Sequence, residues 1–304
     1  MYILGIDSTN KRMSISVNYD ESLLCELEDD NSQRFIVNII SFIDKVLVKS
    51  KIPLQKIDAY CVNLGPGDFT GTRIGISVVK ILAWIQNKPI YGINSLDVFA
   101  AGIALNNKKT IEKSLINDKS LFIWPLLDVK RGELYFALYK IIEGEILEGK
   151  ELLDKSPDKR FNNFKTIIKI SLKNKSYVIC RVSEYCLAEK DNFIKGFKSI
   201  FFANIKEGEF ILGGNAFESY KDLKKNIADV NSNIADVNNK IADVNNKDLN
   251  NDFTPNKLFI FDKKNQFPES RYLNLCTYYH AALENKPGDS NIVPVYVRDF
   301  VPFP

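Results

Sequence analysis

The feature that most constrains the fold is the stretch NLGPGDFTGTRIGISVVKILAW, residues 63–84, where a glycine-rich loop joins a strand to a helix. Residues 58–64 form a short apolar run typical of a buried strand. Between residues 69 and 86, apolar side chains recur at helical spacing. A strand followed directly by an amphipathic helix predicts a sheet with helices packed on it, and therefore an α/β protein.

The glycines of this loop allow two interpretations. The loop matches neither the Walker A pattern nor GxGxxG, but the helix N-terminus and Arg73 would favour a bound anion, with Gly65 and Gly67 shaping the turn. Alternatively, Gly71 and Gly75 lie four residues apart and clear one side of the helix, so that another backbone can approach. The first interpretation predicts phosphate binding and the second predicts an interface.

The rest of the first hundred residues extends the same architecture. Two short strands at residues 2–6 and 13–19 form a hairpin, and residues 23–28 can add a third strand. Helical patterns follow at 32–50 and 95–105, with a strand at 88–94 between the second and third helices. A hairpin followed by alternating strands and helices predicts a mixed sheet flanked by helices.

The second part of the chain is predicted to be another α/β unit. Residues 106–120 are polar and lysine-rich and are expected to be a linker, after which strand patterns recur at 121–129, 132–141, 176–180 and 209–214. We therefore expect two lobes, residues 1–110 and 111–304.

A seven-residue repeat stands apart from both units. The segments NIADVNS, NIADVNN and KIADVNN place Ile and Val three residues apart within residues 226–250. This is formally a coiled-coil heptad, but three heptads are marginal and Asn is a weak helix former. The pattern favours a low-complexity insertion in a surface loop over a coiled-coil arm.

Composition excludes several classes of protein. The formal charge of +3 is too small to predict tight nucleic-acid binding by this chain alone. The five cysteines are odd in number and form no CxxC pair, so unpaired thiols are expected. The start of the chain resembles no secretory signal and no apolar run could span a membrane, so a cytoplasmic protein without membrane contact is expected.

Few residues suggest chemistry. Asp7, Ser8 and Thr9 follow the first strand, where a carboxylate could hold hydrated Mg²⁺ and the turn could bind phosphate oxygens. The same three residues also suit a simple hairpin turn. His280 is the one histidine, and no G-x-S-x-G or HExxH motif occurs. We therefore predict no catalytic and no metal-binding residue.

Several blocks taken in order resemble the TsaB (YeaZ) family, paralogues of the TsaD (Kae1) proteins. They are ILGIDSTNKRMSISV, GPGDFTGTRIGISVVKILAW, PIYGINSLDVFA, LLDVKRGELYFALY, ILGGNA and PVYVRD. The family typically shows GPGSFTGLRIG, from which only Asp68 and Thr72 depart. Many members carry a His-Ser pair where this chain has Asn31 and Ser32.

The resemblance implies a two-lobed actin-like ATPase fold and a role in making N6-threonylcarbamoyladenosine (t6A) in tRNA. TsaB proteins are non-catalytic: they pair with TsaD through two N-terminal helices, here 32–50 and 69–86, and TsaE joins the pair. No cofactor is then required by this chain, although ATP or ADP with Mg could bind weakly at the complex interface. The chain would meet tRNA only within the complex and would form a homodimer when isolated.

Two sets of site residues follow. The predicted partner interface consists of Phe35, Ile36, Ile39, Ile43, Phe69, Thr70, Gly71, Arg73, Ile74, Gly75 and Val78. The predicted nucleotide or anion contacts are Asp7, Ser8, Thr9, Gly65 and Gly67.

The alternative function is an independent ATPase or small-molecule kinase of the same superfamily. It would use Asp7 as the metal carboxylate and a loop near Gly213 and Gly214 for the nucleoside.

Overall fold

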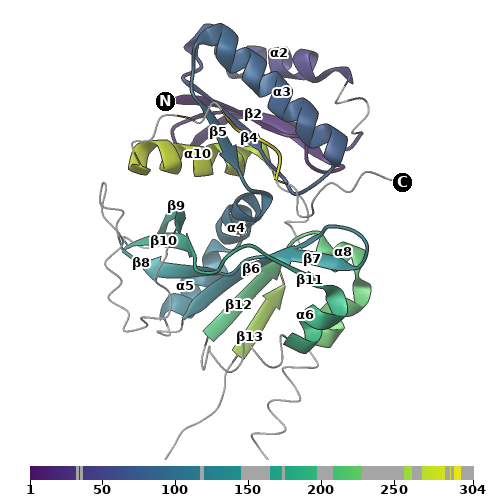
Figure 1. The fold of residues 1–304 in the computed structure, drawn as a ribbon. Coiled ribbons are helices and arrows are strands. Elements are labelled where there is room, and N and C mark those ends of the chain that lie inside the picture. Colours follow the sequence, from purple (N-terminus) through teal and green to yellow (C-terminus); the bar gives the residue numbers. More distant parts are fainter. Residues whose placement is uncertain are drawn as a thin grey trace, which may run out of the picture.

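The computed structural model describes residues 1–31, 34, 37–116, 120–144, 165–172, 175–196, 208–227, 257–261, 269–284, 288 and 291–295. They form two α/β lobes, stacked one above the other in Figure 1. The heptad repeat lies almost wholly within residues 228–256, which are outside the described residues. The residues after Val295 are outside the described residues too. Among the described residues, no helix is both long and apolar enough to cross a membrane.

The first lobe is built on a five-stranded mixed sheet in the order β3-β2-β1-β4-β5. Strands β1, β2 and β3 are antiparallel, whereas β4 and β5 run parallel to β1, as the hairpin start predicted. The elements of this lobe are β1 (Tyr2–Asp7), β2 (Met13–Tyr19), β3 (Ser22–Asp29), α2 (Ile39–Ser50), η1 (Leu54–Lys56), β4 (Ala59–Asn63), α3 (Phe69–Gln86), β5 (Ile90–Ile93) and α4 (Ser95–Asn106).

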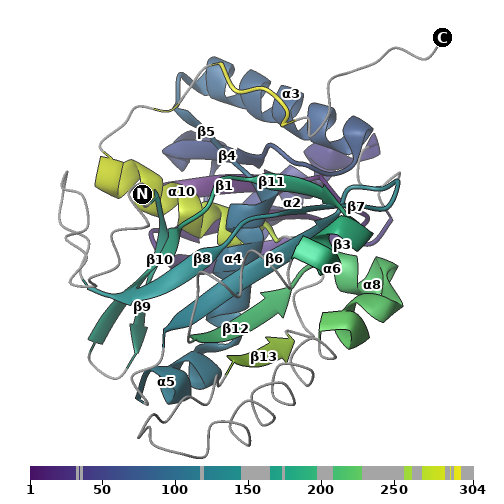
Figure 2. The same ribbon diagram turned by 60° about the horizontal axis from the view of Figure 1, so that its bottom comes forward.

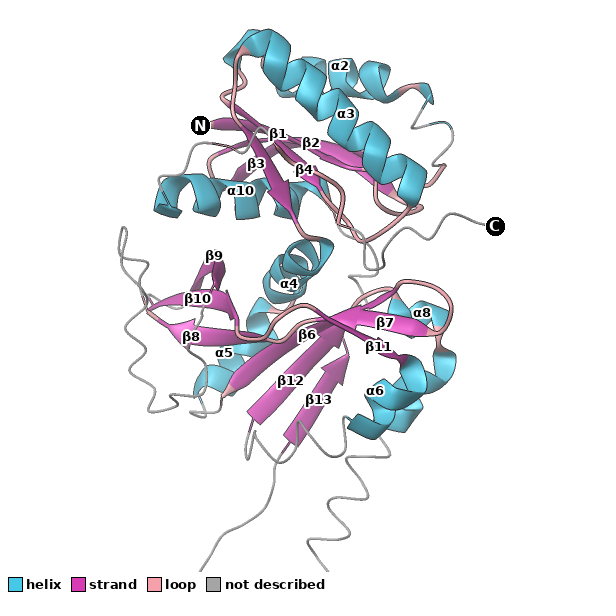
Figure 3. Cartoon of the chain, viewed as in Figure 1, coloured by secondary structure: helices cyan, strands magenta, loops and turns pink. Residues whose placement is uncertain are grey.

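Helices cover both faces of this sheet. Helices α2 and α3 lie on its outer face, α2 against β2 and β3 and α3 mainly against β4 (Figure 3). Their inner sides and the sheet enclose one apolar cluster, which includes Leu4, Ile15, Val46 and Val79. On the other face, α4 and α10 (Ser270–Glu284) lie between the two lobes.

The second lobe carries an eight-stranded sheet whose backbone order is β11-β7-β6-β8-β10-β9, with β12 between β6 and β13 (Figure 2). Its alternating side chains pack toward α4 on one face and toward α6 and α8 on the other. Its elements are α5 (Lys108–Ile116), β6 (Leu121–Asp128), β7 (Glu133–Phe136), β8 (Tyr139–Glu143), β9 (Lys165–Leu172), β10 (Lys175–Arg181), β11 (Cys186–Glu189), α6 (Lys190–Gly196), β12 (Gly208–Gly213), α8 (Ala216–Ser219) and β13 (Lys257–Phe261).

The structure corrects two expectations. The polar segment 106–120 is not a plain linker, because α5 forms there and buries Ile111 and Ser114. The expected boundary at residue 110 assigned α10 to the second lobe, but α10 packs against β1 and β2 of the first. The first lobe therefore combines the beginning of the chain with a helix from near its end.

Candidate functional site

Helix α3 is the helix that follows the glycine loop. Asp68 caps its N-terminus, accepting a hydrogen bond from the Gly71 backbone nitrogen at 2.7 Å, and Asn87 ends it in a left-handed conformation. Gly71, Thr72, Gly75, Ile76, Val79 and Ala83 are buried against the sheet. The opposite side of α3 faces outward, and there the helix displays apolar side chains.

Gly71 and Gly75 are needed for a contact within the chain. A Cβ atom added at Gly71 would overlap the carbonyl oxygen of Ser8, and one added at Gly75 would overlap the hydroxyl of Ser8. The expectation that these two glycines admit a partner's backbone is therefore wrong. The turn after β1 approaches them instead, with the Ser8 backbone at Gly71 and the Ser8 side chain at Gly75.

The outward faces of α2 and α3, together with Val37 just before α2, carry large exposed apolar side chains. Trp84 is 83% exposed, Val37 82% and Val48 76%. The further members of this surface are Ile40, Phe69, Ile81 and Ile85. We call these seven residues the docking face, because a patch of apolar side chains on two adjacent helices is typical of a binding surface.

Only part of the predicted interface lies on this face. Phe69 is on it, Thr70 and Arg73 are exposed beside it, and Ile74 and Val78 are half-buried in the same row of α3 as Ile81 and Ile85. Ile39 and Ile43 are only 5% and 3% exposed and pack into the core, so their assignment to the interface is wrong. Phe35 and Ile36 lie outside the described residues.

The residues that the sequence prediction missed were Val37, just before α2, Ile40 and Val48 of α2, and Ile81, Trp84 and Ile85 of α3. A signal for them existed, because both helices are apolar on more than one side. The sequence did not show which apolar side faces the sheet.

The predicted anion-binding turn is closed upon itself. Asp7 accepts hydrogen bonds from the Thr9 backbone nitrogen at 3.0 Å, the Thr9 hydroxyl at 2.8 Å and the Asn63 side-chain nitrogen at 2.6 Å. The Ser8 hydroxyl donates to the Gly71 carbonyl oxygen at 2.7 Å. These bonds tie the end of β1 to the end of β4 and to the start of α3.

Asn63 extends the network to the next strand end. Its side-chain oxygen accepts from the Gly65 backbone nitrogen at 2.9 Å and from the Ser95 hydroxyl at 2.8 Å. Burial raises the pKa of Asp7 to about 6, because the charged carboxylate is removed from water, although the hydrogen bonds from Asn63 and Thr9 oppose the rise.

This geometry does not suit a metal or a phosphate at the turn. Asp7, Ser8 and Thr9 are all fully buried and Gly65 is buried with them, so their expected contact with a bound anion is corrected. A hydrated Mg²⁺ needs carboxylate oxygens open to water, whereas those of Asp7 are engaged within the chain. Gly67 is exposed at the tip of the loop.

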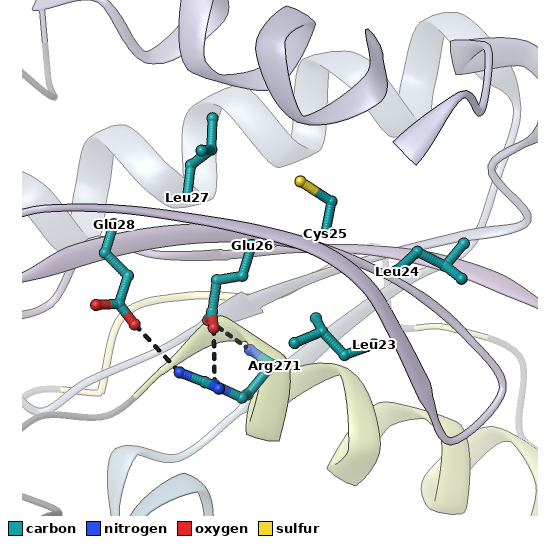
Figure 4. A pocket seen from close by; sticks show the side chains of 7 residues that line it. All are labelled: Leu23, Leu24, Cys25, Glu26, Leu27, Glu28 and Arg271. Carbon is teal, nitrogen blue, oxygen red and sulfur yellow. Dashed lines mark hydrogen bonds and ion pairs between the residues drawn. The ribbon is translucent and has the colours of Figure 1, made fainter. Parts of the chain in front are cut away.

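A second cluster of charges joins β3 to the N-terminus of α10 (Figure 4). Glu26 accepts hydrogen bonds from the Ser270 hydroxyl and the Arg271 backbone nitrogen, both at 3.1 Å, and so caps α10. Burial raises the pKa of Glu26 to about 7. The lining residues, Leu23, Leu24, Cys25, Glu26, Leu27, Glu28 and Arg271, surround an open hollow of about 640 Å³.

The three carboxylates of this cluster are spaced as in a metal site, but an arginine side chain lies among them. Glu26, Glu28 and Glu269 lie close enough together to share a cation. The Arg271 guanidinium lies 2.7 Å from Glu26, 3.4 Å from Glu28 and 2.7 Å from Glu269. We therefore interpret the cluster as a structural ion-pair network.

Two lobes, each a mixed sheet with helices on its faces, give the two-lobed α/β fold of the actin-like ATPase type, as predicted. The fold matches YeaZ from Pseudomonas aeruginosa with a TM-score of 0.55 at 12% identity, over 97% of this chain and 99% of that one. A family model described as "TsaD: tRNA N6-adenosine threonylcarbamoyltransferase" matches residues 29–266. The chain therefore belongs to this family, and within it to the TsaB (YeaZ) group.

Sequence relatives support the same group. The chain is 28% identical over 144 residues to the TsaB protein of Bacillus subtilis, covering 47% of this chain and 57% of that protein. It is 29% identical over 154 residues to the TsaB protein of Escherichia coli, covering 50% and 60%. Over 52 residues it is 46% identical to a tRNA N6-adenosine threonylcarbamoyltransferase of Bifidobacterium longum, covering 17% and 15%. The chain thus spans less than two thirds of the TsaB relatives named here.

Proposed function

We propose that this chain is a non-catalytic scaffold subunit in t6A biosynthesis, which binds and activates a TsaD-type transferase in the cytoplasm together with TsaE. The observation that carries the proposal is the docking face on α2 and α3. The names of the TsaB relatives, which refer to t6A biosynthesis, support the pathway.

The surface chemistry of the docking face suits a protein partner. Apolar side chains as exposed as Trp84 and Val48 gain free energy when water is removed from them, by about 25 cal/mol per Å². Their neighbours on the inner sides of α2 and α3 are fixed in the core, so the two helices present the face on a rigid base. A rigid apolar face loses little conformational entropy on binding.

The proposal includes the absence of autonomous catalysis. The three acceptor contacts of Asp7 support this part, because they use the carboxylate that an independent ATPase would need for its metal. The chain then requires no cofactor of its own. If ATP or ADP with Mg binds weakly at the partner interface, residues outside the buried turn would contact it. The chain would contact tRNA only within the complex.

Reconstitution tests this function. We expect the purified chain to show no transferase activity, and activity to appear when TsaD and TsaE are added. Replacing Ile81 by Asp should lower the activity of the mixture by at least about tenfold, since a carboxylate would be buried without a partner in the interface. The variant Lys221→Glu, an exposed change in the second lobe, serves as the control and should leave activity unchanged.

Full turnover by the chain alone would contradict the scaffold role, and so would tight binding of Mg-ATP by the isolated chain. Co-purification with TsaD and TsaE, repeated without residues 226–250, would show whether the heptad insertion takes part in assembly.

A further inference from the structure

The charged residues of α2 and α3 are arranged in rows beside the docking face. On α3, Arg73 and Lys80 belong to a row three or four residues apart that continues to Trp84. On α2, Lys45 and Lys49 lie four residues apart and form a second row. Against these cations the two helices contain a single carboxylate, Asp44.

Contacts with the sheet show on which side each row lies. Gly71 and Gly75 face Ser8, and Gly71 also lies near Met13, so this flank of α3 is turned toward β1, β2 and therefore α2. The apolar row of Ile74, Val78, Ile81 and Ile85 lies next to that flank on the helix surface. The row of Arg73 and Lys80 consequently lies on the flank of α3 remote from α2.

The same reasoning places the lysines of α2. Helix α2 packs on β2 and on the edge strand β3, so its flank away from α3 lies toward the edge of the sheet. Lys49 belongs to that flank, where it opposes the rise that burial causes in the pKa of the Cys25 thiol of β3. Ile40, Asp44 and Val48 form the next row, toward the middle of the helix pair. The middle of the helix pair is thus apolar apart from Asp44. The cations lie on its two outer flanks, which on α3 also carry Phe69 and Trp84.

Arg73 and Lys45 are exposed, and each lies against an aromatic ring of its own helix. The Arg73 guanidinium lies 3.7 Å from the centre of the Phe69 ring, and the Lys45 ammonium lies 5.2 Å from that of Phe42. Such cation–π contacts favour one position for each charge and so limit the entropy lost when a partner binds.

We propose, building on the function proposed above, that the partner of the docking face is an apolar surface bordered on both sides by carboxylates, and that the basic rows favour it over a second copy of this chain. A second copy would bring an identical surface, because a two-fold interface pairs a patch with itself. Basic flanks would then face basic flanks, and the lone Asp44 of each copy could not neutralise them. An acidic partner gains attraction from the charges that oppose self-pairing.

A charge reversal tests the inference, because it should move two affinities in opposite directions. In Lys45→Glu/Lys49→Glu, we expect the dissociation constant for the TsaD partner to rise about tenfold or more and that of the self-associated chain to fall. The control is Lys221→Glu/Lys225→Glu, a pair of exposed lysines with the same spacing and the same change in net charge, which should alter both constants by less than about threefold.

Salt provides a second readout on the unmodified chain. Raising ionic strength from about 0.05 M to about 0.5 M should weaken binding to the partner and strengthen self-association, since screening removes attraction in one case and repulsion in the other. Both constants can be measured by analytical ultracentrifugation.

The two levels of the proposal fail separately. If Ile81→Asp leaves binding to the partner intact, the docking face is not the binding surface and the proposed function is wrong. If Ile81→Asp abolishes binding but the lysine reversal and the salt series change neither constant relative to the control, the docking face stands and the acidic partner is excluded.

Discussion

Asp7 shows how a residue suited to metal binding can serve structure instead. A carboxylate at the end of the first strand and beside a helix N-terminus is well placed for ligand chemistry. Here its oxygens accept hydrogen bonds from Thr9 and Asn63, and the side chain is fully buried. Its carboxyl oxygens thus hold two strand ends together through hydrogen bonds, and the raised pKa of about 6 reflects the cost of burying the charged form.

That raised pKa predicts a pH dependence of stability. Because Asp7 has a pKa of about 6 in the folded chain and an ordinary value of 3.8, the folded state binds more protons between these limits. Its contribution to the free energy of unfolding is therefore complete below about pH 4 and is lost as pH rises through 6, by up to about 3 kcal/mol. Asp7→Asn should remove this slope from urea denaturation measured between pH 4 and 7.

The exposed Asp44→Asn makes the same change in net charge on α2 and serves as the control. Glu26 also has a raised pKa, but the wild-type chain, Asp7→Asn and Asp44→Asn all contain it. Its effect therefore cancels when their unfolding free energies are compared at each pH. Parallel profiles for the wild-type chain and Asp7→Asn would show that Asp7 does not carry the effect.

At the scale of the element, α3 has two different sides with two different tasks. Its inner side contains Gly71 and Gly75, which permit the helix to lie against the Ser8 turn. Its outer side contains Ile81, Trp84 and Ile85, which remain in water. The glycines therefore position the helix from within, and they contribute to binding only by fixing where the outer side chains lie.

A substitution at Gly71 should consequently damage folding. Gly71→Ala places a methyl group against the backbone carbonyl of Ser8, and we expect it to lower the free energy of unfolding by about 1–3 kcal/mol despite the better helix propensity of alanine. Ser77→Ala, on the exposed side of the same helix, should change it by less than about 0.5 kcal/mol. Equal stability of the two variants in thermal or urea unfolding would refute the close contact with Ser8.

At the scale of the whole molecule, the first lobe is completed by a helix from near the end of the chain. Asn274 of α10 donates hydrogen bonds to the Ile3 carbonyl at 3.3 Å and to the Asn18 side chain at 3.0 Å, and it lies directly over Gly5. With this inner face covered by α10 and α4, it is the outer helices α2 and α3 that present apolar side chains to water. Because α10 and α4 cover the inner face of the first sheet, a partner can bind this lobe only on its outer face, where α2 and α3 lie.

The isolated chain should then self-associate weakly through that side. We expect multi-angle light scattering to show a dimer at high protein concentration that dissociates on dilution, because the docking face is apolar but its flanks are basic. Ile81→Asp should remain monomeric at the same concentrations, with Lys221→Glu as a control that behaves like the unmodified chain. A strict monomer at every concentration and salt would contradict self-association through this face.

Much of the architecture could be read from local patterns. The apolar run before Gly65 and the helical spacing after Asp68 predicted β4 and α3, and α3 spans Phe69–Gln86 as expected. Prediction from local patterns failed where a helix contains many polar residues and few buried ones. Helix α5 is such a case, because its lysines suggested a linker although Ile111 is buried. Local patterns also could not assign α10 to the first lobe, since that contact joins residues more than 200 positions apart, such as Asn274 and Ile3.

Short-range periodicity and motifs were enough to predict the strands and main helices of the first lobe, its mixed sheet and the resemblance to TsaB. In the second lobe they did not predict β9, β11 or β13, and they joined β7 and β8 into one strand. Which side of α2 and α3 faces water could be learned only from the packed molecule, in which Ile39 and Ile43 are buried and Ile81 and Trp84 are exposed. Only it showed that Asp7 is enclosed by its own neighbours. The physical reason is that a side chain's exposure and free hydrogen-bonding capacity depend on the segments packed against it, and these come from distant parts of the chain.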